Sequence, residues 1–250
     1  MTDVLGWRCK FGVVTPSPNS VVQPEYDAMR PVGVTNHLAR MHIEVPPVAG
    51  DKAFQELVRL IDEALEPALE RVMTVDPDHV ILGVSVEAVW HGLAGAEKVR
   101  ERIRAKSRGV DCTTAAEAMP AALQAVGAGS RIAVISPYTE SGNDAVVRYF
   151  AECGIDAVRA MTILRDGPPK RFYNITPDEI RRTLQAIDGT DVSAIVQFGA
   201  NVPNARVAAD AEAWLGKPVI AVNTATYWHA LRVRGIHDKI AGFGQLLERH

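Results

Sequence analysis

Phe11-Gly-Val-Val-Thr-Pro-Ser-Pro-Asn19 is an apolar strand that runs directly into a polar turn, and Arg131-Ile-Ala-Val-Ile-Ser-Pro-Tyr138 repeats the pattern. Each copy is followed by a second buried strand, Val80-Ile-Leu-Gly-Val-Ser85 in the first half and Ala194-Ile-Val-Gln-Phe-Gly199 in the second. The paired strands begin about 70 and about 65 residues apart, as two copies of one α/β unit would. The sequence therefore predicts two similar halves that face each other across a cleft, with Ser85 and Gly199 at equivalent positions.

The bulk composition is that of an ordinary globular protein. Of the 250 residues, 47% are hydrophobic and 23% are charged, and the formal net charge is -3. That charge gives no electrostatic reason to expect nucleic acid or an anionic membrane as a partner. The seven histidines show no metal-ligand spacing, so we expect no metal site.

The cysteines and the N-terminus bear on the compartment. The chain has three cysteines, Cys9, Cys112 and Cys153. Their odd number, and a spacing unlike that of a disulfide framework, favour a reducing environment. No secretory signal begins the chain, and no apolar run approaches the roughly 20 residues of a membrane-spanning helix. We therefore expect a cytoplasmic protein.

Strands and helices alternate along the chain, which predicts parallel sheets with crossover helices. The expected strands are Gly12–Val14, His42–Val45, Val80–Val84, Arg131–Ile135, Ala157–Ile163, Ala194–Phe198 and Pro218–Val222. The expected helices are Ala53–Met73, Ala115–Val126, Asp144–Cys153, Pro177–Ile187, Ala205–Leu215 and Thr226–Val233. We assign residues 1–112 and 223–250 to the first half and 113–222 to the second, because the last helix is expected to return to the first half.

Polar turns follow most of these strands. In open α/β sheets ligands bind beyond the carboxyl ends of the strands, and Ser, Thr and Asn turns at helix N-termini suit small anions such as carboxylates. The same residues are also the usual helix caps and turn formers, so each turn by itself has a purely structural interpretation.

At these turns the chain resembles the aspartate/glutamate racemase superfamily, and within it the maleate cis-trans isomerase and arylmalonate decarboxylase branch. The matching pieces are Thr15-Pro-Ser-Pro-Asn19 with Glu25, Arg40-Met41, Val80-Ile-Leu with Ser85, Thr113-Thr114, Ser136-Pro-Tyr138 with Asn143, Gly199-Ala-Asn201, and Asn223 to Leu231. The resemblance implies two flavodoxin-like halves related by pseudo-twofold symmetry, no cofactor, and chemistry at a carbon next to a carboxylate. From the same resemblance we also expect a homodimer.

The chain departs from this family at both cysteine positions. By resemblance, Ser85 stands where the isomerases carry their first-half nucleophilic cysteine, and Gly199 stands at the second-half position. A thiol is partly ionised near neutral pH, whereas a serine hydroxyl needs an adjacent base and glycine has no side chain. Thiol catalysis is therefore not expected, and Cys112 is interpreted as a small buried side chain.

The resemblance assigns roles to the remaining residues. Asn19 is expected to hold a substrate carboxylate, although an Asx-turn explains it equally. Tyr138 is expected to hydrogen-bond a carboxylate or to carry a proton, the latter only if its pKa falls from about 10. Ser85 is interpreted first as a hydrogen-bond donor, then as a space-filler and last as a nucleophile. The substrate-binding candidates besides Asn19 are Asn143, with Thr113, Thr114, Gly199, Ala200 and Asn201 supplying backbone N–H groups around a second carboxylate or an enolate.

The sequence thus predicts a cofactor-independent isomerase or lyase that acts on a small mono- or dicarboxylate, with Ser85 and Tyr138 as its catalytic residues. Of the reactions known in this family, maleate-type isomerisation is the first expectation and decarboxylation is the second. Two alternatives stay open. Glu87 and His91, four residues apart, could activate a water for a hydrolase or hydratase, or the protein could bind carboxylates without turnover.

Overall fold

Two four-stranded parallel sheets form the frame of the protein. The computed structural model describes residues 3–44, 50–164 and 171–250. The strand orders are β2-β1-β3-β4 and β6-β5-β7-β8, so the second sheet repeats the first strand for strand. The predicted fold of two α/β halves with parallel sheets is confirmed. The strands are β1 Cys9–Pro16, β2 Val34–Met41, β3 His79–Leu82, β4 Cys112–Thr113, β5 Arg131–Ser136, β6 Asp156–Thr162, β7 Ala194–Gln197 and β8 Val219–Ala221.

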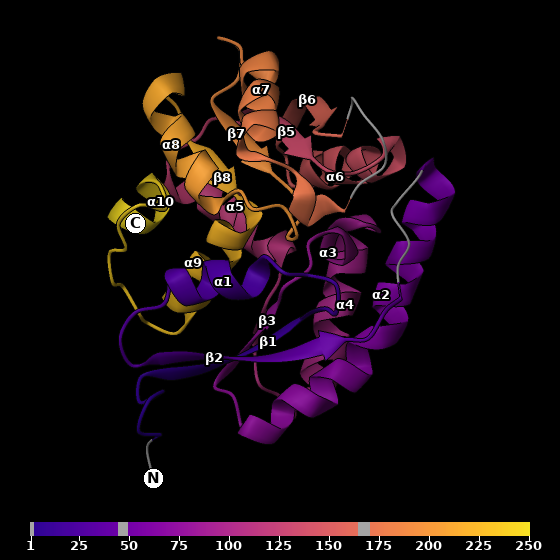
Figure 1. Ribbon diagram of the computed structural model, residues 1–250, viewed down its shortest axis with the longest axis vertical. Coiled ribbons are helices and arrows are strands. Elements are labelled where there is room, and N and C mark those ends of the chain that lie inside the picture. The colour runs from indigo at the N-terminus through magenta and orange to yellow at the C-terminus, as the bar shows by residue number, and fades with distance from the viewer. Residues whose placement is uncertain (1–2, 45–49, 165–170) are drawn as a thin grey trace.

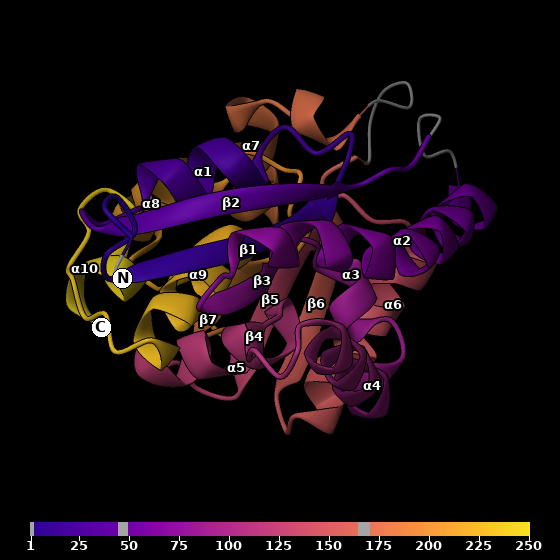
Figure 2. The same ribbon diagram turned by 90° about the horizontal axis from the view of Figure 1, so that it is seen from below.

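Helices cover and join the two sheets (Figure 1). The α-helices are α1 Val22–Ala28, α2 Gly50–Val72, α3 Val86–Val89, α4 Gly92–Lys106, α5 Ala115–Ala125, α6 Glu140–Glu152, α7 Pro177–Ile187, α8 Ala205–Leu215, α9 Val222–Val233 and α10 Gln245–Arg249. Short 3₁₀ turns, η1 Met73–Val75 and η2 Phe172–Asn174, complete the described elements. The helices α2, α4 and α6 pack together along one side, where elements of both halves meet (Figure 2).

The central strands are buried along almost their whole length. In β1 only Lys10 is partly exposed, and all four residues of β3 and of β7 are buried. Such continuous apolar runs are what a parallel strand covered on both faces requires. The carboxyl ends of these strands are followed by Asn19, Ser85 and Gly199, so the sheet topology brings the predicted turns to one region.

Two strands differ from the prediction, and both lie at a sheet edge. The second strand is Val34–Met41 and not His42–Val45; of that range, 42–44 are irregular and Val45 lies outside the described residues. As an edge strand β2 buries few side chains, so its polar sequence gives little strand signal. The two-residue strand β4, which pairs with β3, escaped prediction because it is too short to show a period.

The helix predictions agree more closely. The helices α7 and α8 have the predicted bounds, and α6 begins four residues earlier than expected, at Glu140. The last long helix begins at Val222 and lies beside α1, α5 and the end of the first sheet (Figure 1). The division at residues 112/113 and 222/223 stays a prediction, and β4 spans the first of these points.

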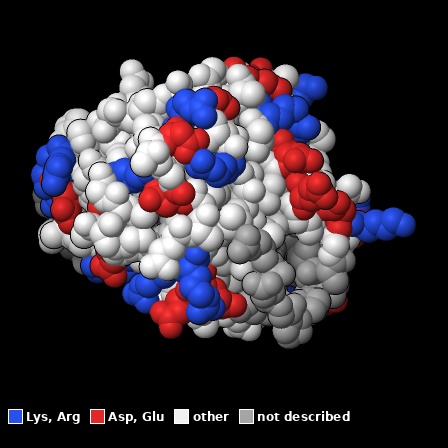
Figure 3. All heavy atoms as spheres, turned by 90° about the horizontal axis from the view of Figure 1, so that it is seen from above, with Lys and Arg blue, Asp and Glu red and all other residues white. Residues whose placement is uncertain are grey.

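No helix among the described residues is both long and apolar enough to cross a bilayer. Within the same residues no group of three or more His, Cys, Asp or Glu side chains is arranged to hold a metal ion. On the face shown in Figure 3, acidic and basic side chains are interspersed without a large patch of one sign.

Candidate active site

A cavity lies between the two sheets and is lined by both halves of the chain. The first half provides an apolar wall from α2 and the loops after β1, β2 and β3, and the second half provides the turns after β5 and β7 and the segment at η2. The lining residues are Pro16, Pro18, Asn19, Ile43, Phe54, Leu57, Ile61, Val84, Ser85, Val86, Tyr138, Arg171, Phe172, Tyr173, Gly199, Ala200 and Asn201. Five of the predicted site residues besides Ser85 are therefore brought together here: Asn19, Tyr138, Gly199, Ala200 and Asn201.

The hydroxyl of Ser85 stands at the meeting point of three groups from the second half. The backbone N–H groups of Gly199 and Ala200 donate to Ser85 Oγ at 3.0 and 3.2 Å. The Tyr138 hydroxyl lies 2.7 Å from the same oxygen. Ser85 is buried, as is Tyr138, so water does not replace these contacts.

Counting donors and acceptors fixes the direction of the hydrogen bond between the two hydroxyls. A serine hydroxyl has two lone pairs and one proton. Both lone pairs of Ser85 Oγ accept backbone N–H groups, so its proton is donated to Tyr138. The phenolic proton of Tyr138 is then left for another acceptor in the cavity. Ser85 Oγ thus accepts from two backbone N–H groups and donates to a phenol.

Tyr138 is held by the turn that ends β5. Its backbone N–H donates to Ser136 Oγ at 2.9 Å, and Ser136 Oγ donates to Asn143 Oδ1 at 2.7 Å. Burial raises the pKa of the Tyr138 phenol, which is the reverse of the fall that a proton-carrying role requires. The geometry therefore fits a hydrogen-bond donor better than an acid.

Asn19 and Asn201 both line the cavity, and Asn201 joins the two halves. Asn19 Oδ1 accepts the N–H groups of Val21 and Val22, each at 2.9 Å, as in an Asx-turn. Its Nδ2 donates to none of the residues that the structure describes, so it is available to a ligand. Asn201 accepts the N–H of Ser20 at 3.1 Å, and its Nδ2 donates to the Pro18 carbonyl at 3.4 Å.

Gly199 adopts a backbone conformation that excludes a side chain. Its φ is +104°, and a Cβ at this position would lie 2.4 Å from Cδ of Pro137. A cysteine here would need a different backbone path. The local backbone geometry at position 199 is thus that of a glycine.

Two parts of the cavity wall were not predicted from the sequence. Phe54, Leu57 and Ile61 lie on the predicted helix Ala53–Met73, but the helical period alone does not distinguish a core face from a cavity face. Arg171 and its neighbours follow a turn-rich stretch without periodicity. The one available signal was the cluster Arg171-Phe-Tyr173, a cation beside two aromatic residues.

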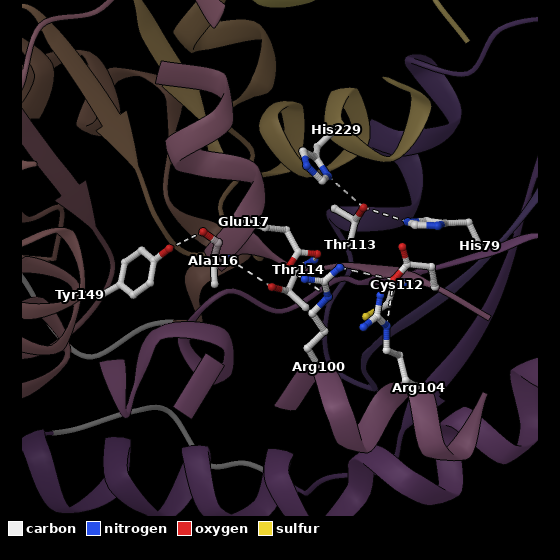
Figure 4. Close-up of polar contacts among 11 residues, drawn as sticks. His79, Arg100, Arg104, Cys112, Thr113, Thr114, Ala116, Glu117, Tyr149 and His229 are labelled. Atoms are coloured by element: carbon white, nitrogen blue, oxygen red, sulfur yellow. Dashed lines mark hydrogen bonds and ion pairs between the residues drawn. The ribbon is translucent and has the colours of Figure 1, made fainter. Parts of the chain in front are cut away.

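Three predicted substrate-binding residues are not brought to this cavity. Thr113 Oγ1 lies between His79 Nε2 and His229 Nδ1, at 2.8 and 3.1 Å (Figure 4). Thr114 caps α5: its Oγ1 accepts the Ala116 N–H and its own N–H donates to Glu117. Asn143 lies inside α6, because that helix begins before it, and it holds Ser136.

The other titratable candidates also lie outside the lining residues. Burial raises the pKa of Cys9 to about 11 and that of Cys112 to about 12, so these thiols stay protonated near neutral pH. Glu87 is buried, and His91 is exposed and precedes α4. Neither residue lines the cavity.

Two duplicated parallel-sheet halves that enclose convergent hydrogen-bond donors in a largely apolar cavity define an enzyme that acts on a small molecule. The chain belongs to the arylmalonate decarboxylase family, whose model matches residues 59–247. This is an enzymatic family, and the chain is accordingly of the isomerase or lyase type.

Relatives of known activity support the same branch. A maleate isomerase of Pseudomonas putida KT2440 is 27% identical over 95% of this chain and 96% of its own length. Two solved structures have the same fold over 96% of this chain. One is a Nocardia farcinica maleate cis-trans isomerase mutant with a covalently bound succinylcysteine intermediate (TM-score 0.85, 22% identity, 98% of that chain covered). The other is an arylmalonate decarboxylase (TM-score 0.73, 19% identity, 100% covered).

Proposed function

We propose that this protein is a cofactor-independent isomerase or lyase that acts next to a carboxylate of a small mono- or dicarboxylic acid. The observation that carries the proposal is the convergence of the Gly199 and Ala200 N–H groups and the Tyr138 hydroxyl on one point of the cavity. Fixed donors in a water-poor site stabilise charge that develops in a transition state. A substrate oxygen that takes this point becomes the oxygen of an enolate-type intermediate, and the Ser85 hydroxyl turns aside.

Of the two reactions, decarboxylation fits the cavity better than isomerisation. Addition of a nucleophile to a double bond, or removal of a proton from carbon, needs a thiolate or a general base. Among the described residues that line the cavity there is no thiol, carboxylate or imidazole. Decarboxylation needs no base, because breaking the carbon–carboxylate bond itself supplies the electron pair.

The decarboxylation step balances with the groups present. The bond between the α-carbon and the departing carboxylate breaks, and its electron pair becomes the enolate of the retained carboxyl group. Carbon dioxide leaves, and the α-carbon takes a proton that comes from water, either directly or through the Ser85 hydroxyl, which water then reprotonates. The wall of Phe54, Leu57 and Ile61 favours neutral carbon dioxide over a charged carboxylate.

Arg171 supplies the positive charge of the cavity. It is the one charged side chain among the described lining residues, and no described carboxylate pairs with it. A guanidinium attracts and orients carboxylates. We assign it to substrate binding, whereas the donors at Ser85 act on the reacting group.

Proton NMR of the protein in D2O with maleate, malonate and aryl-substituted malonates tests this proposal. Decarboxylation of a malonate should appear as loss of its signals and gain of a deuterated mono-acid. Tyr138→Phe removes a donor to the developing charge and should lower the rate by roughly a hundredfold or more. Ser85→Ala should lower it at least about tenfold by removing a proton relay.

Tyr227→Phe is the matched control, because that hydroxyl donates to Asn36 at 3.1 Å and lies outside the cavity. It should leave the rate unchanged. Turnover that is unaffected by both Ser85→Ala and Tyr138→Phe would show that the site is assigned to the wrong residues. Thermal stabilisation by a malonate without turnover would support a carboxylate-binding protein instead.

A further inference from the structure

A chain of polar contacts behind the cavity ends at Ala200, which supplies one of the two backbone N–H donors to Ser85. The Asn223 amide donates to the Ala200 carbonyl at 3.0 Å, and the same amide nitrogen donates to Glu25 Oε2 at 2.6 Å. Ala200 itself donates its N–H to Ser85 Oγ. Both polar groups of the Ala200 backbone are therefore hydrogen-bonded: the N–H to Ser85 and the carbonyl to Asn223.

Glu25 binds three separate elements at once. It lies in α1, and its Oε1 accepts the N–H of Ala205, the first residue of α8, at 2.9 Å, while Oε2 accepts from Asn223 in α9. A carboxylate at a helix N-terminus satisfies a free N–H group and interacts favourably with the helix dipole. One side chain thus ties α1, α8 and α9 together directly behind Ala200.

We propose that Glu25 is a positioning residue which, through Asn223, holds the Ala200 backbone so that the Gly199 and Ala200 N–H groups converge on the cavity. An amide nitrogen with two protons can satisfy the carboxylate and the carbonyl together, which a hydroxyl or a carboxylate at position 223 cannot. This inference rests on the proposed function only for its effect on turnover. The placement of the two amides is measurable without any substrate.

The surroundings of Glu25 make its charge state matter. Limited contact with water raises the pKa of Glu25 to about 7, and its contacts with Asn223 and the α8 N-terminus oppose that rise. Tyr26 on α1 interacts electrostatically with Glu25, and the titratable or charged side chains that line the same surface groove as Glu25 are Arg206 on α8 and Tyr173 at η2. Protonation weakens the charge-assisted bond from Asn223, so the Ala200 contact should loosen as the pH falls below this range.

The test is the exchange rate and chemical shift of the Gly199 and Ala200 amide protons in the full, 15N-labelled chain. The Glu25→Gln side chain has one accepting oxygen in place of two, so it cannot accept from both Asn223 and the Ala205 N–H. Hydrogen exchange of the Ala200 amide should therefore accelerate about tenfold or more. In the unmodified protein the two amide shifts should titrate near neutral pH, and Glu25→Gln should abolish that titration. Asp27→Asn, which changes an acid to an amide on the same helix away from the cavity, should alter neither.

A double variant separates positioning from simple packing. Glu25→Gln with Asn223→Asp restores a donor–acceptor pair between these two residues but leaves the Ala200 carbonyl without a donor. It should regain the Tm lost in Asn223→Asp while the Ala200 exchange and shift stay altered. Recovery of the Ala200 signals together with Tm would overturn the proposal, and so would normal signals in Glu25→Gln. If the amides respond as expected but turnover is absent, the proposed function fails and the positioning role stands.

Discussion

Single side chains decide which chemistry the cavity can support. The Ser85 hydroxyl is a poor nucleophile, since none of the described residues places a base in contact with it and two N–H groups already use its lone pairs. Its position nevertheless marks where two backbone N–H donors and the Tyr138 hydroxyl meet. This arrangement supports the proposed stabilisation of a negative oxygen over attack on carbon, and in the same proposal the guanidinium of Arg171 attracts an anionic substrate.

Replacing Arg171 with glutamine should weaken substrate binding more than it slows the chemical step. Loss of a charged hydrogen-bond partner should raise KM roughly tenfold or more with a smaller change in kcat, and Arg171→Lys should retain part of the affinity. Saturation kinetics, or thermal-shift titration with malonate, measures this. Arg181→Gln is the control, because Arg181 pairs with Asp178 on α7. An equal effect in both variants would exclude Arg171 as a binding residue.

Local caps fix the starts of two helices, α5 and α7, whose residues do not line the cavity. The helices α5 and α7 both begin with a complete capping box, Thr114 with Glu117 and Thr176 with Glu179. In each box the cap side chain and its backbone N–H are both used within the helix. The threonine at 114 was expected to bind substrate through its N–H, and that group is already donated to Glu117.

Thr114→Ala should therefore reduce stability without reducing activity. Loss of an N-cap costs about 1 kcal/mol of unfolding free energy, and kcat/KM should stay within about twofold of the parent value. Thr176→Ala, at the corresponding cap of α7, should behave in the same way. Urea unfolding and steady-state kinetics on both variants check this. A rise in KM confined to Thr114→Ala would restore Thr114 to the substrate site.

The quality of the sequence prediction follows the strength of the local signals. The bounds of α7 and α8 were predicted because Thr176-Pro177 and Gly216 are strong start and stop signals. The strand β2 was misplaced because an edge strand carries a weak hydrophobic pattern. The turns with Asn19, Ser85, Tyr138 and Gly199 were predicted from the duplication, whereas the α2 wall depends on packing between distant segments.

The cavity belongs to the whole molecule, since neither half encloses it alone. Contacts between Ser85 and Gly199, Ser20 and Asn201, and Glu25 and Ala205 all cross between the two sheets. The shape of the site therefore depends on the same packing that determines global stability. Buried carboxyl groups in this structure link that stability to pH.

Glu87 should make the protein less stable as the pH rises. Burial, followed by the nearby charge of Asp62, raises the pKa of Glu87 to about 8 from an ordinary value near 4.5. The folded state then binds more protons than the unfolded state between these two values, so the unfolding free energy falls with pH, by at most about 1.4 kcal/mol per unit. Below pH 4.5 both states are protonated and the effect disappears.

Glu87→Gln keeps a neutral side chain of the same size and should remove this component of the pH dependence. Its unfolding free energy should exceed that of the parent at pH 8 and approach it at pH 4.5, because a buried amide needs no proton to stay uncharged. Urea unfolding at intervals from pH 4.5 to 8 provides the comparison, with Glu101→Gln as the exposed control. A variant whose stability runs parallel to that of the parent over this whole range would show that Glu87 is charged in the folded protein.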